Sequence, residues 1–181
     1  PAQRGGGAAR RPVPKVHRRM TRVPPTLRRF LIPAGVLVDS HRMLRERGEL
    51  GLEAVVVWIG EVLDATTAHI LAAIRPGQVA YRSEEGCAVE VPPDALSELV
   101  AALPPGVFVL ARLHTHPGAA YHSEVDDTNM LISHDRAISI VVPHFARADL
   151  DLSSCSVNEL RHGRGWVELS PAEVAERFMV R

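Results

Sequence analysis

The sequence contains few of the residues that build covalent or cysteine-based scaffolds, and this narrows the class of protein. Two of its 181 residues are cysteine, Cys87 and Cys155, too few for a disulfide framework or a cysteine zinc cluster, so a reducing compartment is expected. The longest strongly apolar run, Ala54 to Ile59, is far shorter than the roughly 20 residues that cross a membrane. The 181 residues are enough for one main domain, and the 46% apolar content is typical of a globular protein. Together with the few cysteines, this makes the cytoplasm the expected location.

Acidic residues are absent from the first 30 positions. This stretch holds eight arginines and Lys15, a charge of +9, whereas the other 151 residues carry −9, so the formal net charge is zero. Residues 1–28 are rich in Gly, Pro and Arg without apolar periodicity, which predicts a disordered basic arm before a folded domain at 29–181. Such an arm could contact nucleic acid or an acidic partner, or be a solvated extension or a misassigned start. Phe, Trp and Tyr total eight, so no stacking platform supports nucleic-acid binding.

Apolar runs and turn residues predict alternating strands and helices from residue 29 onward. The valine-rich run Ala54 to Ile59 is typical of a strand that is buried on both faces. Ser170, Pro171 and Glu173 form the pattern of a capping box at the start of a last helix. The other expected strands are 29–32, 66–74, 87–91, 107–113, 137–142, 155–160 and 165–169, and the other expected helices are 33–47, 92–103 and 126–133. This mixture predicts an α/β fold with one central mixed sheet flanked by helices.

The densest group of chemically versatile side chains lies in LHTHPGAAYHSEVDD, residues 113–127. His114 and His116 alternate at the end of a predicted strand, so both side chains project from the same face. Two imidazoles and a nearby carboxylate can hold zinc and leave a fourth position open for water. An isolated HxH pair is more often a coincidence. Ser123 and Asp126, taken alone, could be an N-terminal cap and a favourable first-turn charge.

Taken together, these residues resemble the motif of the JAMM (MPN+) zinc metalloproteases, in which HxHP is followed by a spacer and then by SxxD. Family members also carry a glutamate seven residues before a glycine, and in GLEAVVVWIG Glu53 stands seven residues before Gly60. The expected order of elements from about residue 29 to 142 follows the family as well. The resemblance implies the MPN fold, a JAB1/MPN-like and cytidine-deaminase-like arrangement of a central mixed sheet flanked by helices.

The spacer of this chain departs from the family pattern. Seven residues usually separate the second histidine from the serine, whereas here there are six, Pro117 to His122. A seven-residue register would place Glu124 at the serine position and Asp127 at the aspartate position. An ionised glutamate cannot donate a hydrogen bond, so we expect the shifted register, with Ser123 and Asp126. The choice between Asp126 and Asp127 as ligand stays open from the sequence.

The resemblance implies a role for each matched residue. His114, His116 and Asp126 would hold Zn²⁺, which lowers the pKa of its bound water toward ~7. Glu53 would act as the general base, unless it is only a surface residue at a strand start, and Ser123 would donate to the oxyanion. Asp127 could hydrogen-bond a ligand histidine. Three further histidines nearby lack the strand pairing: His122, His134 and His144. They are interpreted as loop residues, although His122 could instead donate a hydrogen bond that supports a ligand.

The resemblance also implies the substrate class, cleavage after the C-terminal glycine of ubiquitin or a ubiquitin-like protein. One lysine against 20 arginines suggests a GC-rich bacterial genome. A bacterial member would act on a ubiquitin-like conjugation system with E1-like and E2-like partners, as found in anti-phage operons. The alternatives are trimming of a sulfur-carrier protein in cysteine or cofactor synthesis and a non-catalytic MPN scaffold, against which the retained ligands argue. Neither a membrane nor a nucleic acid is expected as partner.

Overall fold

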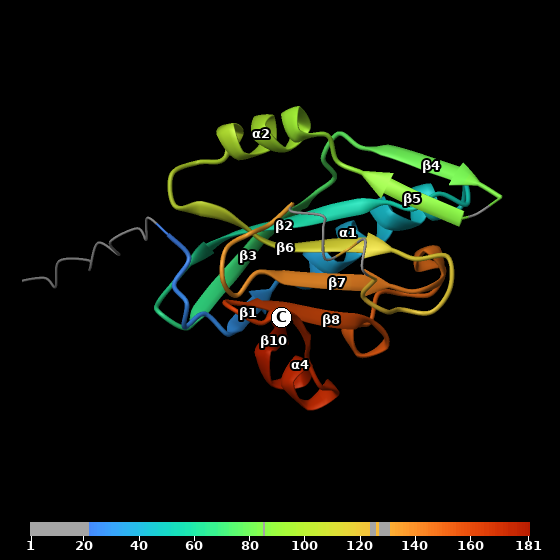
Figure 1. Cartoon of the computed structure of the whole chain (residues 1–181). Coiled ribbons are helices and arrows are strands. Elements are labelled where there is room, and N and C mark those ends of the chain that lie inside the picture. Colours follow the sequence, from blue (N-terminus) through green and yellow to red (C-terminus); the bar gives the residue numbers. More distant parts are fainter. Residues whose placement is uncertain (1–21, 85, 124–125, 127–130) are drawn as a thin grey trace, which may run out of the picture.

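A single mixed β-sheet organises the computed structural model, which describes residues 22–84, 86–123, 126 and 131–181 (Figure 1). Its strands are β1 (Arg29–Ile32), β2 (Val55–Val62), β3 (Thr67–Ile74), β6 (Val107–Thr115), β7 (Ile138–Val142), β8 (Ser156–Arg161), β9 (Gly165–Glu168) and β10 (Phe178–Val180). They lie in the order β10-β1-β3-β2-β6-β7-β8-β9. The pairs β10–β1, β1–β3 and β6–β7 are parallel and the others antiparallel. The predicted α/β fold with a central mixed sheet is confirmed.

Helices and a small hairpin surround this sheet. Helix α1 (Ala34–Gly48) contacts β2, β3 and β6, and α4 (Pro171–Arg177) contacts β1 and β10. A separate two-stranded sheet, β4 (Val79–Ser83) and β5 (Gly86–Glu90), is followed by α2 (Pro93–Ala102). In Figure 1 the hairpin and α2 lie above β2. Two short 3-10 helices complete the described elements, η1 (His144–Ala146) and η2 (Leu152–Ser154). No helix in the described part of the chain is long and apolar enough to cross a membrane.

Strand β2 separates two apolar clusters, which confirms that it is buried on both faces. Val56 and Trp58 belong to the larger cluster together with residues of α1, whereas Val55 and Val57 belong to a smaller one on the opposite face. The indole N–H of Trp58 donates to Ser40 Oγ of α1 at 2.8 Å, so the polar atom of this fully buried ring has a partner. Alternation along the strand therefore fixes which side chains can reach the face that carries the site.

Some boundaries differ from the sequence prediction. Strand β2 continues through Gly60 to Val62 with a register irregularity between Ile59 and Gly60. Glycine is needed there because a Cβ would lie 2.3 Å from the carbonyl oxygen of His69. The capping box at the start of α4 is present as predicted, but the helix ends at Arg177, and β10 then pairs with β1. Neither β4 nor β10 was expected. Of the helix expected at 126–133, residues 127–130 lie outside the described residues, and residues 131–133 are not helical.

The folded part begins before the predicted boundary at residue 28. Leu27 is fully buried in the main cluster, and the backbone N–H of Arg28 donates to Thr66 O at 3.0 Å. The short segment before β1 is therefore part of the domain. Residues 1–21 lie outside the described residues, and the predicted disorder of the basic arm stays a prediction.

Candidate active site

Strand β6 places two histidines at the centre of the sheet. It lies between the antiparallel β2 and the parallel β7, and His114 is its second-last residue. The pairing extends one residue beyond the strand, because the N–H of His116 donates to Val142 O at 2.9 Å. His114 and His116 are 5% and 7% exposed. The backbone on both sides of the two imidazoles is therefore held by neighbouring strands.

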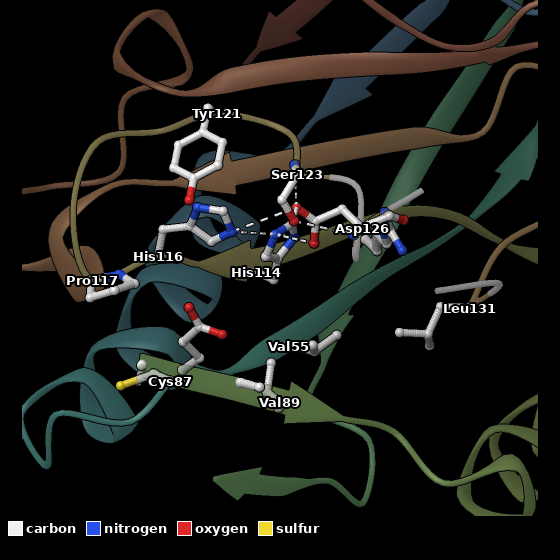
Figure 2. Close-up of a pocket in the computed structure, with 14 residues that line it drawn as sticks. Val55, Cys87, Val89, His114, His116, Pro117, Tyr121, Ser123, Asp126 and Leu131 are labelled. Atoms are coloured by element: carbon white, nitrogen blue, oxygen red, sulfur yellow. Dashed lines mark hydrogen bonds and ion pairs between the residues drawn. The ribbon is translucent and has the colours of Figure 1, made fainter. Parts of the chain in front are cut away.

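His114, His116 and Asp126 bring their ligand atoms together, as Figure 2 shows. His114 Nε2 lies 2.8 Å from Asp126 Oδ1 and 3.3 Å from His116 Nε2, and His116 Nε2 lies 3.6 Å from Asp126 Oδ2. Ligands that bind Zn²⁺ tetrahedrally through bonds of about 2.0–2.1 Å are separated by about 3.3 Å. The donor set and its spacing therefore fit a zinc ion with three protein ligands.

The protonation states of these groups also suit metal binding. Burial lowers the pKa of His114, which outweighs the opposing effect of its hydrogen bond with Asp126 and favours the neutral imidazole. Burial would raise the pKa of Asp126, but hydrogen bonds with His114 and His116 outweigh it and hold that pKa below its usual range. A neutral imidazole and an ionised carboxylate are the forms that coordinate a metal.

Glu53 lies on the wall of the same cavity, which has a volume of about 400 Å³ and is also lined by the three candidate ligands. It precedes β2 by two residues and is 7% exposed, so the alternative interpretation as a surface residue is wrong. Burial raises the pKa of Glu53 to about 7, with His116 opposing the rise and Asp126 adding to it. In the metal-free chain this carboxyl group can exchange a proton at physiological pH, and a divalent cation in the cavity would lower its pKa.

This raised pKa predicts a pH-dependent stability of the metal-free protein. The pKa of Glu53 is near 4.5 in the unfolded chain and about 7 in the folded chain. The stability contributed by the neutral carboxyl is therefore complete below pH 4.5. It is lost as the pH rises through about 7, because the buried group must then ionise. Glu53→Gln removes that charge. In urea unfolding with a chelator present, we expect the variant to exceed the wild type by on the order of 2–3 kcal/mol at pH 8. A stability difference that is the same at pH 5 and pH 8 would contradict the burial of an ionisable Glu53.

Ser123 contacts Asp126 through both its backbone and its side chain. Its N–H and hydroxyl donate to Asp126 Oδ2 at 2.8 and 2.7 Å, and the N–H of Asp126 donates to Ser123 Oγ at 3.3 Å. This is the geometry of the capping alternative. The hydroxyl proton is directed at the carboxylate, so an oxyanion role requires the hydroxyl to turn toward the substrate. That role stays a prediction.

The structure brings Asp126 into the cluster, whereas Asp127 lies outside the described residues. We predict that Asp126→Ala loses zinc because one of three ligands is removed. Asp127→Ala should weaken zinc binding by about 10–100-fold at most, as the loss of a residue that supports a ligand does. Zinc titration of both variants against a chromophoric chelator separates the two cases. The reverse order of effects would show that the seven-residue spacer is the correct register.

None of the other described histidines of the region joins the cluster of candidate ligand atoms. His122 Nε2 lies 3.2 Å from Arg112 Nη2, and His134 contacts the carbonyl oxygens of Val109 and Asp135. Tyr121 was not predicted as part of the site, yet its ring meets His116 edge-on at 4.8 Å between centroids. Arg112, which lines the cavity, was missed too. The sequence did contain a sign of its importance, because Arg112 is the one charged residue in the otherwise apolar VFVLAR of β6.

The turn behind His116 has an unusual backbone. All three residues of η1 have positive φ, between 53° and 55°, although none is glycine. The N–H groups of its first two residues donate to Gly118 O and His116 O, both at 2.8 Å. Gly48 of α1 makes room for this turn, because a Cβ at that position would lie 2.1 Å from the carbonyl oxygen of Phe145. The left-handed turn thus supports the backbone of a candidate metal ligand.

Comparison with known proteins agrees with this geometry. No family model matches the chain. The chain is 31% identical over 156 residues to the probable metalloprotease y4jG of Sinorhizobium fredii, an alignment that covers 84% of this chain and 94% of that protein. The solution structure of protein DSY2949 from Desulfitobacterium hafniense is similar in fold, with a TM-score of 0.57 and 14% identity over 84% of this chain and 92% of that one.

A JAB1/MPN domain protein from Archaeoglobus fulgidus, AF2198, aligns with a TM-score of 0.46 and 15% identity, covering 84% of this chain and 98% of that one. The relative from Sinorhizobium fredii carries the assignment, because its identity extends over most of both chains. Together with the HxHP and SxxD residues, this relationship shows that the chain belongs to the JAMM/MPN metalloprotease family.

Proposed function

We propose that the protein is a zinc-dependent isopeptidase or peptidase that cleaves after the C-terminal glycine of a ubiquitin-like protein. The observation that carries the proposal is one cavity in which the three convergent ligands, the buried Glu53 and the edge of β5 meet. A hydrolytic site therefore adjoins a strand edge along which an extended polypeptide can lie. We propose further that the substrate belongs to a bacterial ubiquitin-like conjugation system, anti-phage systems included.

The chemistry follows from the position of each side chain. His114, His116 and Asp126 would hold the zinc ion, which, when bound, lowers the pKa of a coordinated water and polarises the scissile carbonyl. Glu53 would accept a proton from the attacking water and pass it to the leaving amine. The hydroxyl of Ser123 would donate to the oxyanion of the tetrahedral intermediate. Hydrolysis then needs no further group from the chain.

The position of strand β5 supports the proposal that the substrate binds as an extended tail. Four consecutive residues, Gly86 to Val89, line the cavity, and since side chains of a strand alternate, its main-chain edge borders the cavity. Among the described strands, β5 pairs with β4 alone. Cys87 and Val89 lie across the cavity from the histidines in Figure 2. A tail placed along this edge would gain main-chain hydrogen bonds, and glycines would bring its backbone close to the ligands.

The test uses the zinc-loaded full chain and fusions of ubiquitin-like proteins to a reporter through a Gly-Gly tail. One fusion carries a ubiquitin-like modifier, a second a sulfur-carrier protein, and a third the modifier with alanine in place of the last glycine. Mass spectrometry locates the cut. We expect cleavage after the terminal glycine of the first fusion and little cleavage of the alanine form. Cleavage of the sulfur carrier alone would reassign the substrate, and cleavage only at unrelated peptide bonds would refute the proposal.

Ser123→Ala distinguishes the two roles of the serine. As an oxyanion donor, Ser123 should contribute about 10²–10³-fold to kcat. As a cap, it should contribute about 1 kcal/mol to stability and leave kcat close to normal once zinc is saturating. We expect the loss in kcat, measured at saturating zinc alongside a urea unfolding curve. A variant that is less stable but turns over normally would leave Ser123 with the capping role only.

Two further parts of the proposal concern the surroundings of the enzyme. E1-like and E2-like proteins of the same conjugation system are the proposed partners. The proposed location is the cytoplasm, which is supported by the two cysteines, both free thiols in the structure. Fractionation of the native host with an antibody against this chain tests the location.

A further inference from the structure

We propose that Arg112 is a positioning residue that fixes the carboxylate of Asp126 by holding the preceding loop against the sheet. Arg112 lies on β6 two residues before His114, so the two side chains project from the same face. It is 2% exposed. Its cross-strand neighbour Val57 belongs to an apolar cluster, so the buried charge of Arg112 lies between an apolar strand and the cavity.

The contacts of Arg112 connect the sheet with both ends of the short loop before Asp126. On the sheet side, Nε donates to Ser139 Oγ of β7 at 3.0 Å. On the loop side, Nη2 donates to the backbone carbonyl of Asp126 at 2.5 Å and lies 3.2 Å from His122 Nε2. Since a guanidinium only donates, His122 Nε2 is the acceptor. One side chain therefore anchors the segment 122–126 at its two ends.

Trp166 of β9 completes this arrangement. Its ring lies 5.0 Å from the guanidinium carbon of Arg112 and 5.3 Å from the ring of His122. The indole thus covers the cation and its acceptor together, which favours a guanidinium over other side chains. The planar fork of arginine can serve β7 and the loop simultaneously, whereas the single ammonium group of lysine cannot reach both in the same geometry.

Burial of the Arg112 charge does not by itself stabilise the fold, so the role of this residue must be sought in the site. Removing a cation from water is unfavourable, and an apolar residue of similar volume is often at least as good for stability. The benefit of Arg112 is the positioning of a candidate ligand. His114 and His116 are fixed by strand pairing, whereas Asp126 follows a loop and needs another restraint. A hydrogen bond to the carbonyl of Asp126 restricts the backbone from which its carboxylate reaches His114 Nε2 at 2.8 Å.

The experiment measures zinc and cobalt binding by the full chain, without any substrate. Arg112→Lys keeps the charge and Arg112→Met keeps the length, and both lose the fork. We expect zinc affinity, from competition with a chromophoric chelator, to fall by about 10–100-fold in both. The visible absorption of the Co²⁺-substituted protein should change in intensity, because the Asp126 ligand is less well aligned. Ser139→Ala removes one anchor and should lower zinc affinity by about four- to tenfold, within the usual value of one hydrogen bond.

Arg136→Lys is the matched control. Arg136 is more exposed than Arg112, but it too donates to a backbone carbonyl, Pro25 O at 2.7 Å, and it contacts a buried carboxylate, Glu159. It is not part of the cavity lining. This variant should lose stability but keep its zinc affinity and cobalt spectrum.

The outcomes separate this proposal from the others. Zinc affinities within about twofold of the wild type in Arg112→Lys and Ser139→Ala would overturn it, as would an equal loss in Arg136→Lys. If the Arg112 variants do not fold, Ser139→Ala decides alone by the same criterion. The proposal rests on the assignment of the metal site and not on the substrate: a wild-type chain that holds no zinc refutes the site, and absent cleavage with normal zinc binding refutes only the proposed function.

Discussion

Glu53→Gln should fold, hold zinc at the wild-type stoichiometry and bind a Gly-terminated tail, yet cleave about 10²–10⁴-fold more slowly. The amide keeps the size and polarity of the side chain but cannot accept the proton of the attacking water. Glu53 lines the cavity and is not one of the three residues whose ligand atoms converge. Affinity for the tail should survive, because main-chain hydrogen bonds along β5 do not involve Glu53.

The measurement is single-turnover cleavage of a Gly-terminated conjugate, with zinc content and tail binding determined on the same preparation. Glu61→Gln is the control, since Glu61 lies on β2, which follows Glu53 in the chain, but is exposed beside His69. It should cleave normally. Near-normal cleavage by Glu53→Gln would remove this residue from the mechanism, and loss of zinc would make it a ligand or a structural residue.

His116→Ala should abolish both zinc retention and hydrolysis. Two protein ligands, His114 and Asp126, would remain. A water molecule in place of the third ligand would not restore the free energy of metal binding that is lost. The backbone should be retained, because the N–H and carbonyl of residue 116 pair with Val142 and Phe145 independently of the side chain.

Metal analysis after dialysis and a cleavage assay on the same sample test this variant. His69→Ala is the matched histidine control, since His69 is partly exposed on β3 and faces Glu61 rather than the site. It should keep one equivalent of zinc. A His116→Ala protein with a full equivalent of zinc and normal activity would show that the ligand assignment is wrong.

Local pattern was sufficient for much of the fold and for the face of the sheet on which His114 and His116 lie. Alternation at the end of β6 placed His114 and His116 on one face, and the valine run of β2 implied burial on both faces, because each depends only on strand periodicity. The resemblance to the JAMM motif pointed to Glu53 through its spacing to Gly60, but the burial of Glu53 depends on the cavity that β5 and the histidine loop form around it. Sequence periodicity does not encode that enclosure.

Features that depend on distant partners escaped prediction. Phe178–Val180 becomes a strand because β1, far away in the sequence, offers it a parallel edge. Arg112 stood out in its strand, but its contacts come from two other parts of the chain, Ser139 of β7 and the segment that holds His122 and Asp126. The left-handed turn at η1 carries no glycine, the usual sequence signal of positive φ, so nothing local distinguishes it.

That turn has a consequence for the order in which the molecule is assembled. A left-handed conformation costs roughly 1–2 kcal/mol per non-glycine residue, so three in succession would not persist in an isolated segment. The turn is held by its packing against Gly48 of α1 and by a hydrogen bond from His41 Nε2 to Ala146 O at 3.0 Å. Only when α1 has docked on the sheet can η1 present its N–H groups to the backbone at His116 and Gly118. The backbone at His116 is thus held by packing of the chain itself, and we expect it to keep its conformation in the metal-free protein.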